Sequence, residues 1–238
     1  MSKLIPTMTN FTRCSDSNEP ISNFKLPRGH AGVSILWPNN WNSKIKKLSD
    51  GNERIVVVAI SSSPELLVIN AYMPTIKTDS QFEYAECLDI LSDIVSKYRQ
   101  SYHVIICGDL NATLHDSRNN KHDLLLKEFV QEHGFHIEKS VGDEPTFYHH
   151  ANSGTSQIDY ILYLDSDILT QYQILDRAFA NTSSHCAVYS TTNINIPTVK
   201  RNVNLQKQTR TKIKWKNMYD SGYKTKFKLV YRKLMLEP

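Results

Sequence analysis

The sequence has no long hydrophobic segment. No apolar run in its 238 residues approaches the roughly 18 residues that a membrane-spanning helix needs. Residues 1–16 also lack the continuous apolar core of a secretory signal peptide. From these two absences we expect an intracellular protein, nuclear or cytoplasmic, without a membrane partner.

Close cysteine pairs are also absent. Cys14, Cys87, Cys107 and Cys186 are scattered along the chain, without the CxxC spacing that most zinc sites show. We interpret them as free thiols with mainly structural roles. The chain has no internal repeat, and its length suits one large α/β domain, or one domain followed by a tail.

Positive charge is concentrated at one end of the chain. Residues 197–238 hold twelve of the 28 Lys and Arg residues but two of the 24 acidic residues, which gives +10 there and −6 elsewhere. Such a segment suits a phosphate backbone, because cations neutralise phosphates and aromatic rings stack on bases. A solvated linker helix is an equally supported interpretation of this segment. The aromatic residues of this segment recur at helical spacing, at Tyr219, Tyr223, Phe227 and Tyr231.

The sequence pattern divides the chain into three parts. Residues 1–28 are polar and rich in Asn, Ser, Asp and Pro, which predicts a loop or a poorly ordered segment. Residues 29–196 alternate between β-rich runs and helical patterns, which predicts a mixed α/β sheet with helices on its outer faces. Residues 197–238 are interpreted as a basic tail or connector.

Individual elements follow from periodicity. A first helix is expected to begin at Asp79 or Ser80, with a capping box formed by Ser80 and Glu83. A second helix is expected over residues 123–133, closed by Gly134. The apolar stripe of the first helix is Leu88, Leu91, Val95 and Tyr98. Strands are predicted at 29–37, 54–60, 66–72, 104–106, 157–164 and 185–194, with a hairpin turn at 61–65 and an extended piece at 145–148.

Polar residues stand at the ends of several predicted strands, where sites gather in layered α/β folds. A carboxylate beside a histidine forms an acid/base pair, and a second carboxylate with an asparagine can hold Mg²⁺ and a phosphate oxygen. Metal-assisted phosphoester hydrolysis is the reaction class that needs this set. The residues are Asn70, Tyr72, Asp109, Asn111, Asp159 and His185, the last preceded by Ser183 and Ser184.

Each of these residues also has an ordinary structural interpretation. Asp109 and Asn111 can close a strand in an Asx-rich turn. Tyr72 can be a half-buried strand tyrosine, Asp159 a strand-edge acid and His185 a histidine of a turn. The residues taken singly leave both interpretations open, and their order along the chain favours the chemical one.

That order resembles a known superfamily. The matching segments are residues 29–37 (GHAGVSILW), 70–74 (NAYMP), 107–111 (CGDLN), 146–147 (TF), 157–160 (QIDY) and 183–186 (SSHC). Together they resemble the endonuclease/exonuclease/phosphatase superfamily, and within it the apurinic-endonuclease-like domain of LINE-type (non-LTR) retrotransposons. The resemblance implies a DNase I-like, four-layer α/β/β/α sandwich, with Mg²⁺ or Mn²⁺ as cofactor and DNA as partner.

The resemblance also implies a role for each matching residue. Tyr72 contacts the scissile phosphate, beside Asn70 in the substrate-binding set. Asp109 assists the attacking or leaving oxygen, and Asn111 binds a nonbridging oxygen. His185, oriented by Asp159, acts on the phosphate or on the nucleophilic water. The implied metal ligands are Asp109, Asn111 and Ser184.

Two departures from the family pattern bear on activity. Relatives carry an Asn and a metal-binding Glu on strands ahead of the glycine-rich strand, whereas this chain has residues 1–28 there, so we expect the first strands to be missing. Ser184 stands where many relatives have Asp, and serine is a poorer ligand for a hard cation. Our leading hypothesis is a retroelement-derived endonuclease with impaired activity. The alternatives are a noncatalytic nucleic-acid-binding remnant, and a phosphatase or phosphodiesterase of the same superfamily.

Overall fold

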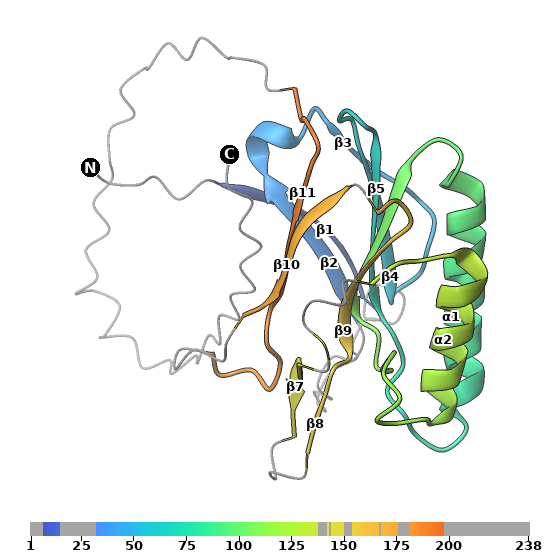
Figure 1. The fold of residues 1–238 in the computed structure, drawn as a ribbon. Helices are drawn as coiled ribbons and strands as arrows, with labels where there is room; N and C mark the ends of the chain where they lie inside the picture. The colour runs from blue at the N-terminus through green and yellow to red at the C-terminus, as the bar shows by residue number, and fades with distance from the viewer. Residues whose placement is uncertain are drawn as a thin grey trace, which may run out of the picture.

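A five-stranded mixed sheet forms the centre of the structure (Figure 1). The computed structural model describes residues 7–14, 32–137, 142, 144–149, 154–166, 168–175 and 181–197. The pair β5–β6 is parallel, and the other neighbouring strands are antiparallel. The order across the sheet is β3 (Ile45–Lys47), β4 (Ile55–Ile60), β5 (Leu66–Tyr72), β6 (His103–Asp109) and β9 (Asp159–Tyr163).

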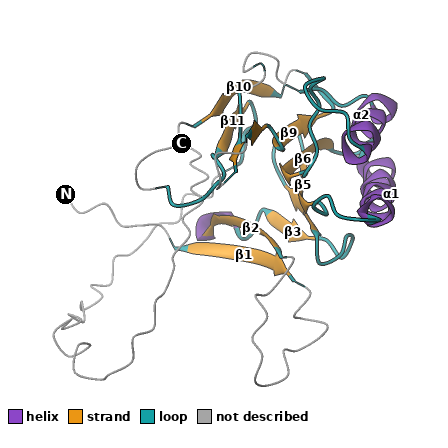
Figure 2. Ribbon diagram, turned by 90° about the horizontal axis from the view of Figure 1, so that it is seen from below, coloured by secondary structure: helices purple, strands orange, loops and turns teal. Residues whose placement is uncertain are grey.

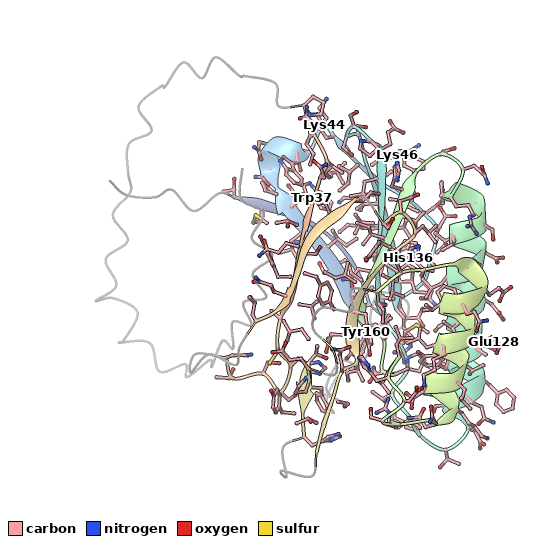
Figure 3. The ribbon with its side chains drawn as sticks, viewed as in Figure 1. Trp37, Lys44, Lys46, Glu128, His136 and Tyr160 are labelled. Atoms are coloured by element: carbon pink, nitrogen blue, oxygen red, sulfur yellow. The ribbon has the colours of Figure 1, made fainter. Side chains whose placement is uncertain are left out.

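Two helices cover one face of this sheet. α1 (Ser80–Tyr98) connects the parallel strands β5 and β6, and α2 (Lys121–His133) lies beside it (Figures 1 and 2). Figure 3 shows Glu128 on α2, at the exposed surface of the helix layer, and Tyr160 on β9. Tyr160 belongs to the buried cluster between the helices and the sheet. The stripe predicted for α1 is confirmed, because Leu88, Leu91 and Val95 are buried in one cluster with alternate residues of the strands.

α1 begins at Ser80, as predicted, but the capping contacts differ from the prediction. Asp79 occupies the N-cap in a left-handed conformation, with φ of 60°, and its side chain makes no capping bond. Ser80 Oγ bonds instead to the backbone of Lys77 and to the His122 ring, so the predicted capping box with Glu83 is wrong. Sequence spacing does not reveal this because the competing partner, His122, is distant in the chain.

The second helix begins earlier than predicted. α2 starts at Lys121, and a capping box between Asn120 and Asp123 satisfies its first turn. It ends at Gly134, as predicted, where φ is 74°. The helix therefore begins directly after the polar loop that leaves β6.

A second layer of strands covers the other face of the sheet (Figure 2). β1 (Met8–Arg13) pairs with β2 (Val33–Pro38), followed by a short 3-10 helix, η2 (Asn39–Trp41), and β10 (Leu169–Ile174) pairs with β11 (Val188–Thr192). Trp37 of β2 is buried in a cluster with Val58 and Ile105 of the central sheet. The described part of the chain thus contains three of the four expected layers: helices, central sheet and second strand layer.

The prediction of a loop over residues 1–28 is wrong for residues 8–13, because these form β1. The Thr- and Asn-rich composition of this segment favours a loop, but Phe11 packs against the buried cluster that contains Trp37, Val58 and Ile105. The Arg13 guanidinium fixes the end of the strand by donating to four carbonyls, those of Leu48, Ser49, Asp50 and Ile55. Residues 1–6, 15–31 and 198–238 lie outside the described residues, so the expectations for these segments, the basic tail among them, remain predictions.

The other strand predictions hold with shifted ends. The runs at 54–60, 66–72, 104–106 and 157–164 correspond to β4, β5, β6 and β9. The last strand begins at Val188, so His185 lies in the preceding loop. β3 and β10 are not predicted by the sequence pattern, because β3 has only three residues and the inner residues of β10 are mostly polar. In the part of the chain that the structure describes, no helix combines the length and the apolar character needed to cross a membrane.

Arg13→Ala tests whether β1 belongs to the folded domain. Loss of the guanidinium hydrogen bonds should lower the free energy of unfolding by about 2 to 4 kcal/mol, measured by urea denaturation with circular dichroism. Lys46→Ala, which removes an exposed cation from β3, is the matched control and should cost less than about 0.5 kcal/mol. If Arg13→Ala is as stable as the control, β1 contributes nothing to the fold.

Candidate active site

Two carboxylates face each other at one end of the central sheet. Asp109 is the last residue of β6, Asp159 is the first residue of β9, and the antiparallel register pairs them directly. Asp109 lies on the same face of β6 as Ile105, which packs toward the second strand layer. Asp109 is 8% exposed and Asp159 is 7% exposed. Like charges at opposed positions destabilise a strand pair, so this site favours a cation or a proton between the carboxylates.

The His185 ring lies between these two carboxylates. Its Nδ1 is 2.9 Å from Asp159 Oδ2, which confirms the predicted contact, and its Nε2 is 3.9 Å from Asp109 Oδ2. The first distance is a hydrogen bond, whereas the second permits a charge interaction but is too long for a direct hydrogen bond. One ligand atom from each of the three residues lies within 4.8 Å of the others, so the group can hold a metal ion.

A tight turn fixes Asp109 and Asn111. The Asn111 backbone N–H donates to Asp109 Oδ1 at 3.1 Å, and the Asn111 φ is 50°. Asn111 Nδ2 donates to the Met73 carbonyl at 2.8 Å, while the Met73 N–H donates to the Asp109 carbonyl. The two interpretations of Asp109 therefore coexist: Oδ1 closes an Asx turn, and Oδ2 faces His185.

Gly108 allows β6 to approach β5 closely at this end of the sheet. Its φ is +135°, and a Cβ there would lie 2.0 Å from the Ala71 carbonyl oxygen and 2.7 Å from Asn70 Oδ1. Real Cβ atoms do not approach other atoms so closely, so a side chain at Gly108 would push the strands apart. The glycine before Asp109 is therefore required by the register of the site-bearing strands.

Asn70 and Tyr72 lie on β5, on the same face as Asp109. The parallel register places Tyr72 beside Asp109 and Asn70 beside Cys107. Asn70 Nδ2 donates to the Ser34 carbonyl of β2 at 2.9 Å, so its amide joins the two strand layers. Tyr72 is half-buried, and the Arg54 guanidinium lies 5.8 Å from its ring centroid. All the strand-end residues of the prediction thus gather on one rim.

The serines before His185 shape the loop that carries it. Ser183 Oγ accepts a hydrogen bond from the His185 backbone N–H at 3.1 Å. The Ser184 carbonyl accepts one from the Tyr148 N–H at 2.9 Å. Whether the Ser184 side chain binds a metal stays a prediction.

Burial raises the pKa of the nearby Cys107 to about 12, so this thiol stays protonated at neutral pH, as expected for a structural cysteine.

Residues beneath the rim hold the Asp109–Asn111 turn from the helix side. Tyr84 of α1 is buried, and its hydroxyl donates to the Leu110 carbonyl at 2.8 Å. Burial, and then the charges of Asp123 and Asp109, raise the pKa of Tyr84 well above its ordinary value, so the hydroxyl remains a donor. The His122 ring stacks on Tyr84, with centroids 4.1 Å apart. The sequence pattern does not reveal this support, because it identifies both helices only as packing elements.

Asp123 holds the polar loop that follows the site. It accepts hydrogen bonds from Arg118 and from the backbone of Thr113 and Asn120. Burial alone would raise the pKa of Asp123, but these hydrogen bonds hold it below its ordinary value. The loop is therefore fixed by an ionised carboxylate at the start of α2.

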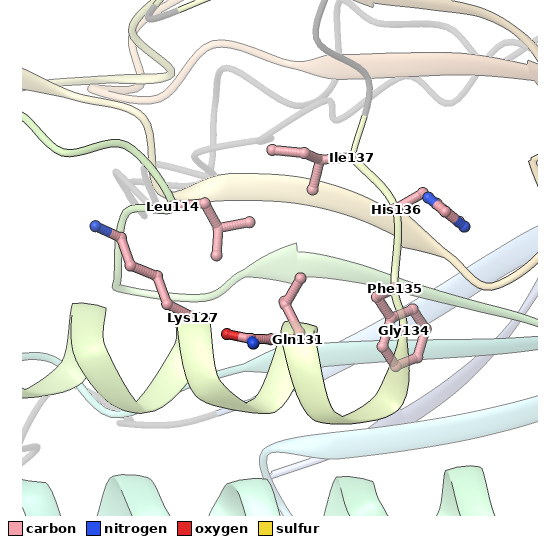
Figure 4. Close-up of a pocket in the computed structure, with 8 residues that line it drawn as sticks. Leu114, Lys127, Gln131, Gly134, Phe135, His136 and Ile137 are labelled. Carbon is pink, nitrogen blue, oxygen red and sulfur yellow. The ribbon is translucent and has the colours of Figure 1, made fainter.

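Two pockets lie near these elements. One, of about 380 Å³, is lined by the loop after β6, by residues on either side of β7 (Phe147–Tyr148) and by β8 (Thr155–Ser156). Its lining includes His115, Arg118 and Gln157. The other, of about 360 Å³, is mostly apolar and lies at the end of α2 (Figure 4). The lining of this second pocket includes neither Asp109 nor its partners Asp159 and His185. The second pocket is therefore separate from the candidate site.

Comparison with known proteins gives relatives at the level of family and fold. Residues 66–189 match the protein family described as endonuclease-reverse transcriptase. The solved endonuclease domain of TRAS1, a telomere-specific non-LTR retrotransposon, is 17% identical with a TM-score of 0.53, over 80% of this chain and 79% of that chain. The 3′ phosphatase NExo from Neisseria, solved with a product DNA hairpin, is 15% identical with a TM-score of 0.54, over 68% of this chain and 75% of that chain. No curated protein matches the sequence. These likenesses establish a DNase I-like nuclease fold.

The buried histidines make stability depend on pH. Burial lowers the pKa of His122 and His133 below the ordinary value of 6.5. The unfolded chain then binds more protons than the folded one below about pH 6.5, so the free energy of unfolding should fall as the pH falls from about 7 to 5. His122→Phe keeps a ring against Tyr84 and should reduce this slope, as measured by urea denaturation at several pH values.

The matched control for this change is His136→Phe, because His136 is exposed. The control should retain the pH slope of the wild type. Identical slopes in all three proteins would show that burial of the His122 ring does not oppose its protonation.

Proposed function

Because this chain belongs to the endonuclease-reverse transcriptase family, we propose that its Asp109–His185–Asp159 group hydrolyses phosphodiester bonds of DNA with a divalent cation. The observation that carries the proposal is the position of one imidazole between two buried carboxylates. DNA is favoured as the substrate class because NExo was solved with product DNA and the similar domain of TRAS1 is an endonuclease.

The geometry of the three residues supports a proposed role for each. Asp159 accepts the hydrogen bond from His185 Nδ1–H, which fixes the ring and directs Nε2 toward Asp109. His185 Nε2 and Asp109 Oδ2 can then act on the same reacting oxygen, one moving its proton and the other stabilising or accepting charge. The low exposure of both carboxylates strengthens these interactions, because little water screens them.

The donor set fits a hard divalent cation. Carboxylate oxygens are the ligands that Mg²⁺ and Mn²⁺ prefer, and two of them converge here with an imidazole nitrogen. Asp109 would hold the cation, with Asn111 and Ser184 as further proposed ligands. When bound, the cation supplies positive charge that stabilises the developing charge on the phosphate.

The remaining rim residues are proposed to bind substrate. The Tyr72 hydroxyl would contact the scissile phosphate, and the second amide hydrogen of Asn111 would bind a nonbridging oxygen. Asn70 Nδ2 already donates to Ser34, so we propose that Asn70 contributes mainly by holding β5 against β2. Impaired activity, from serine at position 184, is part of the proposal.

A second candidate is a 3′ phosphatase on DNA ends, favoured by the fold-level likeness to NExo. The same acid/base group can act on a phosphomonoester, because both reactions place charge on a phosphate oxygen. Assays with supercoiled plasmid and with an oligonucleotide that bears a 3′ phosphate distinguish the two activities.

We expect Asp109→Asn and His185→Ala each to lower the rate of Mg²⁺-dependent plasmid nicking by about 10²- to 10⁴-fold, as for loss of an acid/base group. EDTA should abolish nicking by the wild type. His103→Ala is a matched control, because His103 Nδ1 forms a 2.8 Å pair with Asp165 at the opposite end of β6. Equal rates in all variants would indicate a contaminating nuclease or a wrongly assigned site.

A boundary between the α/β domain, which includes β1 and extends to residue 196, and a basic segment at 197–238 is also proposed. Deletion after Pro197 should weaken DNA binding in the Asp109→Asn background and reduce the slope of log affinity against log salt by about 0.9 per lost phosphate contact. Fluorescence anisotropy with labelled duplex measures both quantities. Unchanged affinity and salt slope would favour the linker interpretation, and binding without cleavage by the wild type would favour the noncatalytic remnant.

A further inference from the structure

Thr146 is a fully buried polar residue next to the candidate site. Its side-chain Oγ1 accepts hydrogen bonds from two consecutive backbone N–H groups, those of Ile158 at 3.0 Å and Asp159 at 3.1 Å. These N–H groups lie at the start of β9, directly at the carboxylate that holds His185. One hydroxyl therefore fixes the backbone from which the Asp159 side chain projects.

The backbone of the same segment holds the loop that carries His185. The Cys186 N–H donates to the Thr146 carbonyl at 2.7 Å, and the Tyr148 N–H donates to the Ser184 carbonyl at 2.9 Å. These two bonds bracket a bridge between Phe147 and His185, whose ring centroids are 4.7 Å apart. The segment is thus bonded to the backbone of Asp159 and to the two residues that flank His185.

We propose that Thr146 is a positioning residue that sets the distance and orientation between Asp159 and His185. The proposal rests on the proposed hydrolytic function of this pair. Asp159 and His185 come from separate segments of the chain, and Thr146 is bonded to both of these segments, through its hydroxyl on one side and its carbonyl on the other. A shift of Thr146 moves one partner relative to the other.

The chemistry of the contact specifies the side chain that is needed. An oxygen acceptor must lie where it meets two backbone donors at once, and buried N–H groups without an acceptor are costly. Serine offers the same acceptor, cysteine offers a weaker one, and valine has the shape of threonine without an acceptor. Activity should therefore decrease in the order Thr, Ser, Cys, Val at this position.

The test compares Thr146→Ser, Thr146→Cys and Thr146→Val in the full chain. With a DNA substrate and Mg²⁺, Thr146→Val should lower kcat by about 10- to 100-fold at nearly unchanged KM, as for loss of an outer-shell partner. Thr146→Ser should stay within about threefold of the wild type. Val95→Ala, which truncates a buried residue of α1 away from the rim, controls for loss of stability and should retain the wild-type kcat.

A second readout does not depend on activity. The side-chain ¹⁵N resonances of His185 and the backbone amide of Asp159 report the pair directly by NMR. They should shift in Thr146→Val and remain near their wild-type positions in Thr146→Ser and Val95→Ala. Should Thr146→Val fail to fold, the comparison of Thr146→Cys with Thr146→Ser decides the matter.

The outcomes separate this inference from the function on which it rests. A wild type that cleaves no DNA overturns the proposed function, while the NMR comparison still tests the positioning role. Wild-type kcat and wild-type His185 resonances in both Thr146→Val and Thr146→Cys would overturn the positioning role alone. A loss of kcat that Val95→Ala reproduces at equal thermal stability would also overturn it.

Discussion

The opposition of Asp109 and Asp159 across the β6–β9 pair is the constraint on which the site depends. Antiparallel pairing brings opposed Cβ atoms to about 4.5–5.5 Å, where two ionised carboxylates repel each other. The pair is also largely removed from water, which increases the repulsion. His185 relieves this cost from one side, and the same unfavourable pairing gives the site its affinity for positive charge. The residues that would perform chemistry are therefore a source of local instability.

The surrounding structure compensates for this instability with buried apolar surface. All six residues of β4 are buried, because helices cover one face of the sheet and strands cover the other. Each fully buried aliphatic side chain contributes about 1.5–3 kcal/mol, so a few such residues offset one unfavourable charge pair. Gly108 meets a different requirement, since it brings β5 close enough to place Tyr72 beside Asp109.

Sequence reasoning succeeds where the signal is local. The apolar runs of β4, β5 and β6 and the stripe of α1 identify the central sheet and its helix, and the order of the motifs is enough to group Asp109, Asp159 and His185. It fails where a distant partner decides the outcome. β1 is polar in composition and becomes a strand by pairing with β2; Ser80 bonds to a histidine of another helix; and the partners of Thr146 are backbone groups that no side-chain pattern reveals.

The loop that carries His185 is attached in a different way from the strands that carry the carboxylates. Asp109 and Asp159 are end residues of β6 and β9 in the central sheet, whose inner strands carry backbone amides that should exchange with solvent only on global unfolding. The loop is held to the short segment at residues 146–148 by one backbone hydrogen bond on each side of His185, at Ser184 and Cys186, and by the contact of the His185 and Phe147 rings. It therefore belongs to a smaller cooperative unit, whose local opening costs less free energy than unfolding of the sheet. The proposed hydrolytic activity would then be lost by fluctuation or in mild denaturant while the core of the molecule remains native.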